Sequence, residues 1–262
     1  MSRELFDGFG IESLENRRMM AGDVSVDVTG GGDLRIDGDN ASNEIVIRGT
    51  DVQGRFEIRG KQGTLVNGQQ SIVVDGVTDD VRINLRNGDN RLEIEAGPQE
   101  SDVTINDDLQ IRTGNGSDVI LLDEVRVLGT ASINTGGGDD GFLGSEIRIN
   151  GDFRWNSGSG DDVLLMDRMT IRGRMRANMG SGDDVAFLYD SEFFDGVQLS
   201  LGSGDDILGV AVSHARADVA VNGGGGTDII LTDSNEIDGE YRLRSVEDGS
   251  EVPNLDIFDL FV

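Results

Sequence analysis

A short phrase recurs along the second half of the chain at a fixed step of 22 residues. It reads RTGNGSDVILLD from residue 112, NTGGGDDGFLGS from 134, NSGSGDDVLLMD from 156, NMGSGDDVAFLY from 178, SLGSGDDILGVA from 200 and NGGGGTDIILTD from 222. A strict period of this length indicates a stack of similar structural units, each of which buries its apolar side against its neighbours. The repeat therefore constrains the fold more than any local propensity does.

Three short strand-like runs fit into one unit. Between residues 161 and 182 they are DVLLM, MTIRG and RMRANM, separated by Asp, Gly or Arg. Three strands and three turns in so few residues are typical of one coil of a parallel β-helix, whereas a helical repeat needs longer segments. We therefore predict an all-β, right-handed parallel β-helix with about 22 residues per coil and a short helical segment at the N-terminus.

Side chains of one kind fall into columns when the units are aligned. Two columns are apolar and are predicted to form the core; they are Ile120, Phe142, Leu164, Ala186, Leu208 and Ile230, and Val127, Ile149, Ile171, Phe193, Ala215 and Ile237. A polar column holds Asn84, Asn134, Asn156, Asn178 and Asn222, with Arg112 and Ser200 as exceptions. Stacked asparagines can hydrogen-bond along a solenoid axis, and we expect this column at a corner where the strand pairing is interrupted.

The repeat divides the chain into four parts. Residues 1–22 precede the strands as a leader or N-terminal cap, and residues 23–85 read as irregular first coils with hairpins. Regular coils span 86–244, where AGPQES (96–101) is an outward loop, and 245–262 form a C-terminal tail or cap.

Composition narrows the classes of partner. Fifty acidic and 22 basic residues give a net charge of -28, which repels nucleic acid and anionic membrane surfaces and attracts cations. We therefore expect no nucleic-acid partner and, without a stretch of ~20 apolar residues, no membrane insertion. The chain has no cysteine and one histidine, His214, so thiolate chemistry and zinc clusters are poor hypotheses. We expect His214 to be a structural or surface residue.

The acidic turns point to a metal. Equivalent carboxylates in adjacent coils would lie ~4.8 Å apart and repel one another, so they need cations, protons or outward orientation. Gly180, Gly182, Asp184 and Ala186 match the glycines, aspartate and apolar residue of the RTX calcium-binding β-roll repeat, and the chain resembles that family at this turn. The resemblance implies Ca²⁺ held by turn carbonyls and by Asp118, Asp140, Asp162, Asp184, Asp206 and Asp228.

A second interpretation of the same turns stays open. RTX coils carry the motif on both turns and begin it with a further glycine, whereas this chain has it on one turn in three with Thr, Ser, Met, Leu or Gly at that place. The turn could then be only a polar corner that opposes aggregation. The first acid of each pair, as in Asp161 and Asp183, is expected to be solvated.

The N-terminal segment carries a second resemblance. FGIESLENRRMMAGDV (9–24) resembles the Leu-Glu-x-Arg-x-Leu-Leu leader of large bacterial surface and secreted repeat proteins, through Leu14, Glu15 and Arg17. The resemblance implies an extracellular or cell-surface location. The alternative is an amphipathic helix that plugs the open end of the solenoid.

The recurrence of the aspartate pair in successive units bears on whether the chain is an enzyme. Parallel β-helices include polysaccharide lyases and hydrolases, and paired aspartates are what a glycosidase needs. A catalytic pair should be a local exception, however, whereas this one recurs in step with the fold. We therefore predict a non-enzymatic structural or interaction protein, with a polysaccharide-acting enzyme as the alternative.

Alternation along the strand after each acidic turn predicts an apolar exterior. If Leu164 and Ala186 point inward, their neighbours point outward and make an exposed patch larger than monomers usually show. We call this the outer apolar face and expect a homo-oligomer or fibre to form through it, with the C-terminal tail as the alternative cover; it is represented by Val163, Leu165, Val185, Phe187 and Ile207.

Overall fold

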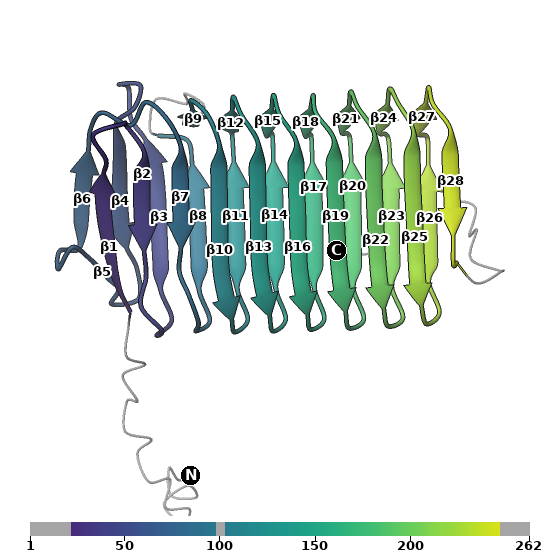
Figure 1. Cartoon of the computed structure of the whole chain (residues 1–262), viewed down its shortest axis with the longest axis horizontal. Helices are drawn as coiled ribbons and strands as arrows, with labels where there is room; N and C mark the ends of the chain where they lie inside the picture. Colours follow the sequence, from purple (N-terminus) through teal and green to yellow (C-terminus); the bar gives the residue numbers. More distant parts are fainter. Residues whose placement is uncertain (1–21, 98–102, 247–262) are drawn as a thin grey trace, which may run out of the picture.

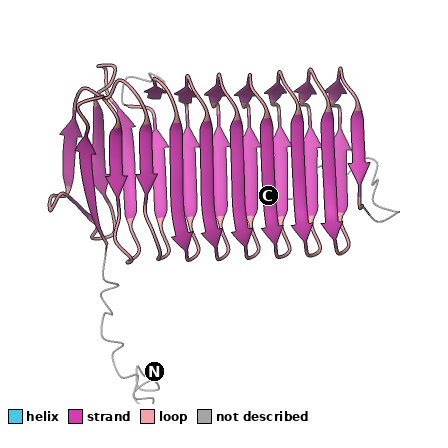
Figure 2. Cartoon of the chain, in the orientation of Figure 1, coloured by secondary structure: helices cyan, strands magenta, loops and turns pink. Residues whose placement is uncertain are grey.

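The computed structural model describes residues 22–97 and 103–246, and this part of the chain consists of strands and turns without a helix (Figures 1 and 2). A membrane-spanning helix is accordingly not found among these residues. The strands form three long stacks, which we call sheets 1, 2 and 3. The predicted leader or cap at the N-terminus and nearly all of the C-terminal tail lie outside the described residues, as does part of the 96–101 loop.

Sheet 1 contains β1 (Asp23–Val28), β2 (Leu34–Asp37), β5 (Leu65–Val66), β7 (Val81–Asn84), β10 (Leu109–Asn115), β13 (Ala131–Gly137), β16 (Phe153–Ser159), β19 (Met175–Ser181), β22 (Val197–Ser203), β25 (Val219–Gly225) and β28 (Tyr241–Arg244). Sheet 2 contains β3 (Glu44–Gly49), β4 (Phe56–Gly60), β6 (Ser71–Val74), β8 (Arg91–Glu95), β11 (Val119–Asp123), β14 (Gly141–Ser145), β17 (Val163–Asp167), β20 (Val185–Tyr189), β23 (Ile207–Ala211) and β26 (Ile229–Asp233). Sheet 3 contains β9 (Val103–Ile105), β12 (Val125–Val127), β15 (Arg148–Ile149), β18 (Thr170–Ile171), β21 (Glu192–Phe193), β24 (His214–Ala215) and β27 (Glu236–Ile237).

Each regular coil contributes one strand to each sheet, and six such coils run from β10 to β27 (Figure 1). Residues one period apart are direct partners, as Leu164 and Ala186 are in sheet 2 and Ile149 and Ile171 are in sheet 3. The pairing is parallel throughout these coils. The predicted parallel β-solenoid with 22 residues per coil is therefore confirmed.

The interior is filled by the two predicted apolar columns. Strand alternation places every second side chain inside, so that Phe142, Leu164 and Ile171 are at most 1% exposed. Ile237 is the exception in these columns, with 37% of its surface exposed. It belongs to the last described coil, and no described coil covers it from the far side.

The asparagine column lies elsewhere than predicted. Its members stand within the strands of sheet 1, where Asn134, Asn156 and Asn178 are in register and the strand pairing continues. They face outward, and Asn178 Nδ2 donates a hydrogen bond to Asn156 Oδ1 at 2.8 Å. The column is therefore a hydrogen-bonded feature of an outer sheet face and not of a corner.

The first section of the solenoid is built from hairpins. The six strand-like runs between residues 23 and 85 form β1, β2, β3, β4, β6 and β7. Antiparallel pairs β1–β2, β3–β4 and β4–β6 extend sheets 1 and 2 beyond the first coil. Ile58 in β4 and Val66 in β5, which pairs in parallel with β1, are completely buried, so this end of the core is covered by the chain itself.

Candidate metal site in a column of buried aspartates

The corner between sheets 1 and 2 depends on two glycines per coil. In one coil these are Gly180 and Gly182, with φ of 103° and 128°, a backbone region that side-chain-bearing residues rarely adopt. A Cβ atom on Gly182 would lie 2.0 Å from the carbonyl oxygen of Gly160 in the preceding coil. The glycines therefore allow both the turn and the close stacking of one turn on the next.

The structure places all six predicted aspartates in one column on the inside of this corner. None of Asp118, Asp140, Asp162, Asp184, Asp206 and Asp228 is more than 2% exposed. Each carboxylate accepts a hydrogen bond, through Oδ1, from the backbone N–H of the column residue in the preceding coil. The distance is 2.8 Å from Asp140 N to Asp162 Oδ1 and 2.8 Å from Asp162 N to Asp184 Oδ1. We call these residues the inner aspartate column.

The first acid of each pair forms a second column on the outside of the same corner. Asp161 and Asp183 are exposed, as expected, but they are not merely solvated. The backbone N–H of Asp183 donates to Asp161 Oδ1 at 2.8 Å, and that of Asp205 donates to Asp183 Oδ1 at 2.8 Å. Both acids thus replace the strand pairing that the turn interrupts, a role that turn geometry alone did not predict.

The second carboxylate oxygen of the inner column has no partner. In all six residues Oδ2 is buried and accepts no hydrogen bond from the described residues. The pKa of Asp140 and of Asp184 is raised to about 7, mainly by burial and in part by the carboxylates of neighbouring coils. The backbone N–H that each carboxylate accepts, and the Thr135 hydroxyl near Asp140, oppose this rise without cancelling it. Burial also raises the pKa of Asp118, Asp162 and Asp206. An unpaired buried charge is costly, so each of these oxygens needs a proton or a cation.

Two asparagines continue the inner column toward the N-terminus and show what surrounds that oxygen. The backbone N–H of Asn90 donates to Asp118 Oδ1 at 2.7 Å, and that of Asn43 donates to Asn90 Oδ1 at 2.9 Å. The amide nitrogen of Asn90 donates to the carbonyl oxygens of Gly88 at 2.8 Å and Arg86 at 3.1 Å. These carbonyls stand two and four residues before Asn90, where the aspartate coils have their two glycines. An ionised Oδ2 in the place of that amide would face carbonyl oxygens and could donate nothing to them.

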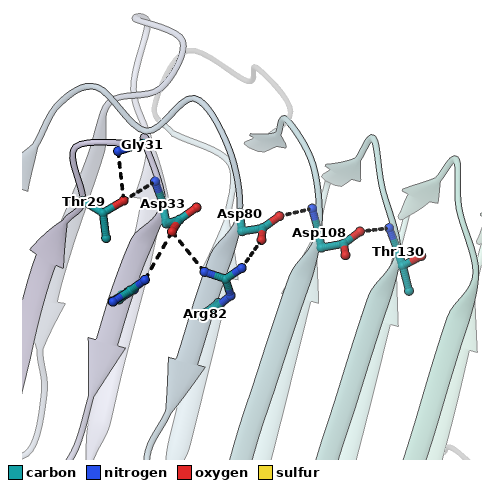
Figure 3. A network of polar contacts seen from close by, with 8 residues as sticks. Thr29, Gly31, Asp33, Asp80, Arg82, Asp108 and Thr130 are labelled. Atoms are coloured by element: carbon teal, nitrogen blue, oxygen red, sulfur yellow. Dashed lines mark hydrogen bonds and ion pairs between the residues drawn. The ribbon is translucent and has the colours of Figure 1, made fainter.

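The corner between sheets 3 and 1 provides a contrast, because there arginine side chains pair with the aspartate carboxylates. Figure 3 shows Asp80 Oδ1 accepting the backbone N–H of Asp108 at 3.0 Å, and Asp108 Oδ1 accepting that of Thr130 at 2.7 Å. The guanidinium of Arg82 bridges Asp80 and Asp33, at 3.0 Å from Asp33 Oδ2. As in the inner aspartate column, Oδ1 of Asp80 accepts the backbone N–H of a neighbouring coil. Here, however, Oδ2 of Asp80 also has a cationic partner, Arg82.

Further along this arginine-paired corner, the neighbouring arginines lower the pKa of Asp152. Asp152 Oδ2 lies 2.7 Å from Arg154 and 3.4 Å from Arg176. Partial burial acts to raise the pKa of Asp152, but the backbone N–H of Arg174 and the two guanidinium groups lower it below its ordinary value. In the inner aspartate column, which has no arginine partner among the described residues, the shifts run the other way. The pKa is raised at Asp118, Asp140, Asp162, Asp184 and Asp206.

The sequence did not predict two other clusters of side chains that could bind a metal ion. Asp79, Asp80 and Asp107 bring carboxylate oxygens within 4.8 Å of one another, and so do His214, Glu236 and Asp238 with their ligand atoms. His214 and Glu236 are direct strand partners in adjacent coils, so the repeat step of 22 could have revealed this pair. The first group joins coils separated by 28 residues, where the longer spacing conceals the match.

The outer apolar face lies on sheet 2 with the predicted parity. Val163 is 37% exposed and Leu143 is 41% exposed, whereas Leu165, Val185, Phe187 and Ile207 are partly buried. Phe187 lies over Gly209 of the next coil, since a Cβ atom there would meet its ring at 2.2 Å. Leu231 stands in the same column as Phe187, where alternation predicts an outward side chain, but it is only 6% exposed.

No protein-family model, no curated protein and no solved structure matches this chain, so its architecture alone places it, as a parallel β-solenoid of 22-residue coils with a buried aspartate column.

Proposed function

We propose that this chain is a non-enzymatic structural or interaction protein, an acidic rod that binds Ca²⁺ along its inner aspartate column. The observation that carries the proposal is the row of buried, unpartnered Oδ2 atoms in Asp118, Asp140, Asp162, Asp184, Asp206 and Asp228. The rod form follows from the stacked coils, each of which contacts only its neighbours.

A cation is favoured over other ways to relieve this column. Where the chain has Asn90, an amide satisfies the turn carbonyls, and where it has Asp152, arginine satisfies the second oxygen. The inner aspartates have neither partner. Their surroundings offer carboxylate and backbone carbonyl oxygens, which are the ligands that Ca²⁺ prefers.

The ion would act as a link between coils. Each aspartate would contribute Oδ2, and the paired glycines of its turn would contribute carbonyl oxygens. Binding to the folded column but not to the unfolded chain adds RT ln(1 + [L]/Kd), about 2.7 kcal/mol for a site at a hundred times Kd. The RTX resemblance of the turn supports the same ion.

Thermal melting tests this proposal. We expect the melting temperature of the full chain to rise with millimolar Ca²⁺ and to fall on addition of EDTA, with a smaller response to Mg²⁺, which demands a stricter geometry. The double variant Asp161→Asn/Asp183→Asn, in the outer column, should keep the response. A melting temperature that neither Ca²⁺ nor EDTA changes would reduce the turn to a polar corner.

We propose that the chain is not an enzyme, because the aspartate pairs recur in successive coils. The aspartate pairs have the same hydrogen bonds in successive coils, as Asp161 and Asp162 have with Asp183 and Asp184, and no coil stands out as a catalytic exception. We expect no turnover of acidic polysaccharides such as pectin or alginate. Turnover that is lost when a single aspartate pair is changed would contradict this.

Self-association is proposed through the outer apolar face. The support for this is that Val163 and Leu165 point outward from sheet 2 and are partly exposed beside Leu143. On a sheet face that only contacts solvent, the outward side chains are normally polar, because exposed apolar patches promote association. Leu165→Glu/Phe187→Glu should convert an oligomer into a folded monomer in sedimentation. A wild-type chain that already sediments as a monomer would exclude this part of the proposal.

Location and handedness complete the proposal. The Leu-Glu-x-Arg resemblance of residues 14–17 supports display at the cell surface or secretion, with 1–22 as leader or helical cap. We propose right-handed coils, because parallel strand crossovers are right-handed in nearly all proteins. Fractionation of cells that produce the tagged chain, with and without residues 1–22, tests the location.

A further inference from the structure

The two ends of the described solenoid differ. Side chains that are buried in the middle coils are exposed in the last one, although they occupy the same columns. Ile171 is fully buried, whereas its equivalent Ile237 is 37% exposed. Met175 is fully buried, whereas Tyr241 in its column is 44% exposed. At the other end the hairpin residues Ile58 and Val66 are fully buried.

A cavity of about 400 Å³ lies at the exposed end, inside the last coils. Most of its wall is apolar, and its lining includes Phe193, Leu208, Val221, Ile230, Ile237 and Tyr241. Repeat proteins need a capping element where the stack ends, both to cover the core and to protect the free strand edges. Here the edges belong to β26, β27 and β28.

We propose that the chain's own C-terminal segment, residues 254–262, docks into this cavity and closes the solenoid. The segment reads NLDIFDLFV and is the most apolar stretch beyond Val246. Val246, the last described residue, already packs against the core. The seven residues between Val246 and Asn254 can span ~25 Å when extended, which is ample for a cavity that begins at the preceding strand.

The chain's own tail fits this cavity better than a second copy does. A head-to-tail stack would need an open apolar surface at the other end, and the hairpins of β3 to β6 already fill that end with buried Phe56, Ile58 and Val66. A tethered segment also acts at a high effective concentration, in the millimolar range for short linkers. The inference is independent of Ca²⁺ and of the outer apolar face.

Disulfide trapping tests the docking directly, because the chain has no cysteine of its own. Ile237→Cys in the cavity wall is combined in the full chain with a cysteine at Leu255, Phe258 or Phe261 in turn, since a disulfide needs Cα atoms within ~4.4–6.8 Å. The matched control replaces Ile237→Cys by Val52→Cys, which is 44% exposed at the far end. We expect a disulfide within the monomer for at least one cavity pair, at a yield at least tenfold above the control.

Three outcomes overturn the inference. A disulfide that joins two chains would assign the cavity to the tail of a neighbouring molecule. A yield equal to that of the Val52→Cys control would show only random encounters. Failure of all three cavity pairs to react would leave the tail outside the cavity.

Amide exchange supplies a second readout that does not depend on cysteine. Deletion of 254–262, or the milder change Phe258→Asp/Phe261→Asp, should speed exchange in β27 and β28 at least tenfold and leave β13 to β16 unchanged, because only the last coil loses its cover. Unchanged protection of β27 and β28 would contradict docking.

Discussion

The backbone N–H of Asp162 donates a hydrogen bond of 2.8 Å to Oδ1 of Asp184, one coil further along the solenoid. The equivalent bond joins each member of the inner aspartate column to the next, from Asn90 to Asp228. A carboxylate is used here as a backbone acceptor, and its second oxygen remains buried without a partner. In this column, Oδ1 therefore has a hydrogen-bond partner in the neighbouring coil, whereas Oδ2 has none within its own turn.

The hydrogen-bonding part of this role can be separated from charge by comparing two neutral replacements of Asp184. Asp184→Asn keeps the acceptor for the N–H of Asp162, whereas Asp184→Ala leaves that buried donor unpaired. We expect the alanine variant to be less stable than the asparagine variant by about 1–3 kcal/mol in EDTA. Urea denaturation measures the difference. Equal stability of the two variants would mean that water replaces the carboxylate.

The converse change at Asn90 should create a new defect. Asn90→Asp loses the donor that binds the carbonyls of Gly88 and Arg86 and places another acid beside Asp118. In EDTA at pH 8 we expect a loss of stability of about 1–3 kcal/mol, and Ca²⁺ should restore more of it than it adds to the wild type. A variant that is as stable as the wild type in EDTA would show that this position tolerates an unpaired oxygen.

Without metal, stability should depend on pH in the direction that the raised pKa values dictate. Asp140 and Asp184 bind protons up to about pH 7 in the folded state, whereas an unfolded aspartate releases its proton near pH 4. The stabilisation is present below pH 4 and is lost as the pH rises through 7. In EDTA the melting temperature of the wild type should therefore fall as the pH rises from about 4 to about 7. The double variant Asp140→Asn/Asp184→Asn is the control, and its melting temperature should change less over the same range.

The glycine pairs give a steric prediction with an internal control. Gly182→Ala would force a side chain into a backbone with φ of 128° and within 2.0 Å of the Gly160 carbonyl, at a cost of about 1–3 kcal/mol or more. Gly141→Ala, where a Cβ atom meets nothing within 4 Å, should leave the free energy of unfolding nearly unchanged. Similar losses in both variants would argue against the tight stacking of turns.

The repeat step predicted the coils and most of the core because a fixed period fixes the strand register as well. Ile120, Leu164 and Ile171 could be placed inside from alternation alone. The same reasoning failed at Ile237, since a periodic pattern does not indicate where the stack loses its cover. It also misplaced the asparagine column, because β19 extends through Asn178 to Ser181 and carries Gly180 at positive φ inside the strand.

The candidate site was predicted in its residues but not in its bonding. Spacing placed the six aspartates in one column and gave them inward parity. That both acids of a pair accept backbone N–H groups, in opposite directions along the rod, depends on how neighbouring turns orient their amides. The contrast with the arginine-paired corner of Asp80 and Asp152 likewise required three-dimensional contacts between coils.

The central claim is that the inner column is destabilising when ionised and unpaired, and stabilising when a cation binds it. Melting of Asp162→Asn/Asp184→Asn against the wild type, at pH 8 in EDTA and then in millimolar Ca²⁺, tests it most directly. We predict that the variant melts above the wild type in EDTA, because its amides can bind the turn carbonyls as Asn90 does, and below the wild type in Ca²⁺. A variant that melts below the wild type in both buffers by the same margin would show that the column neither destabilises the metal-free protein nor binds a cation.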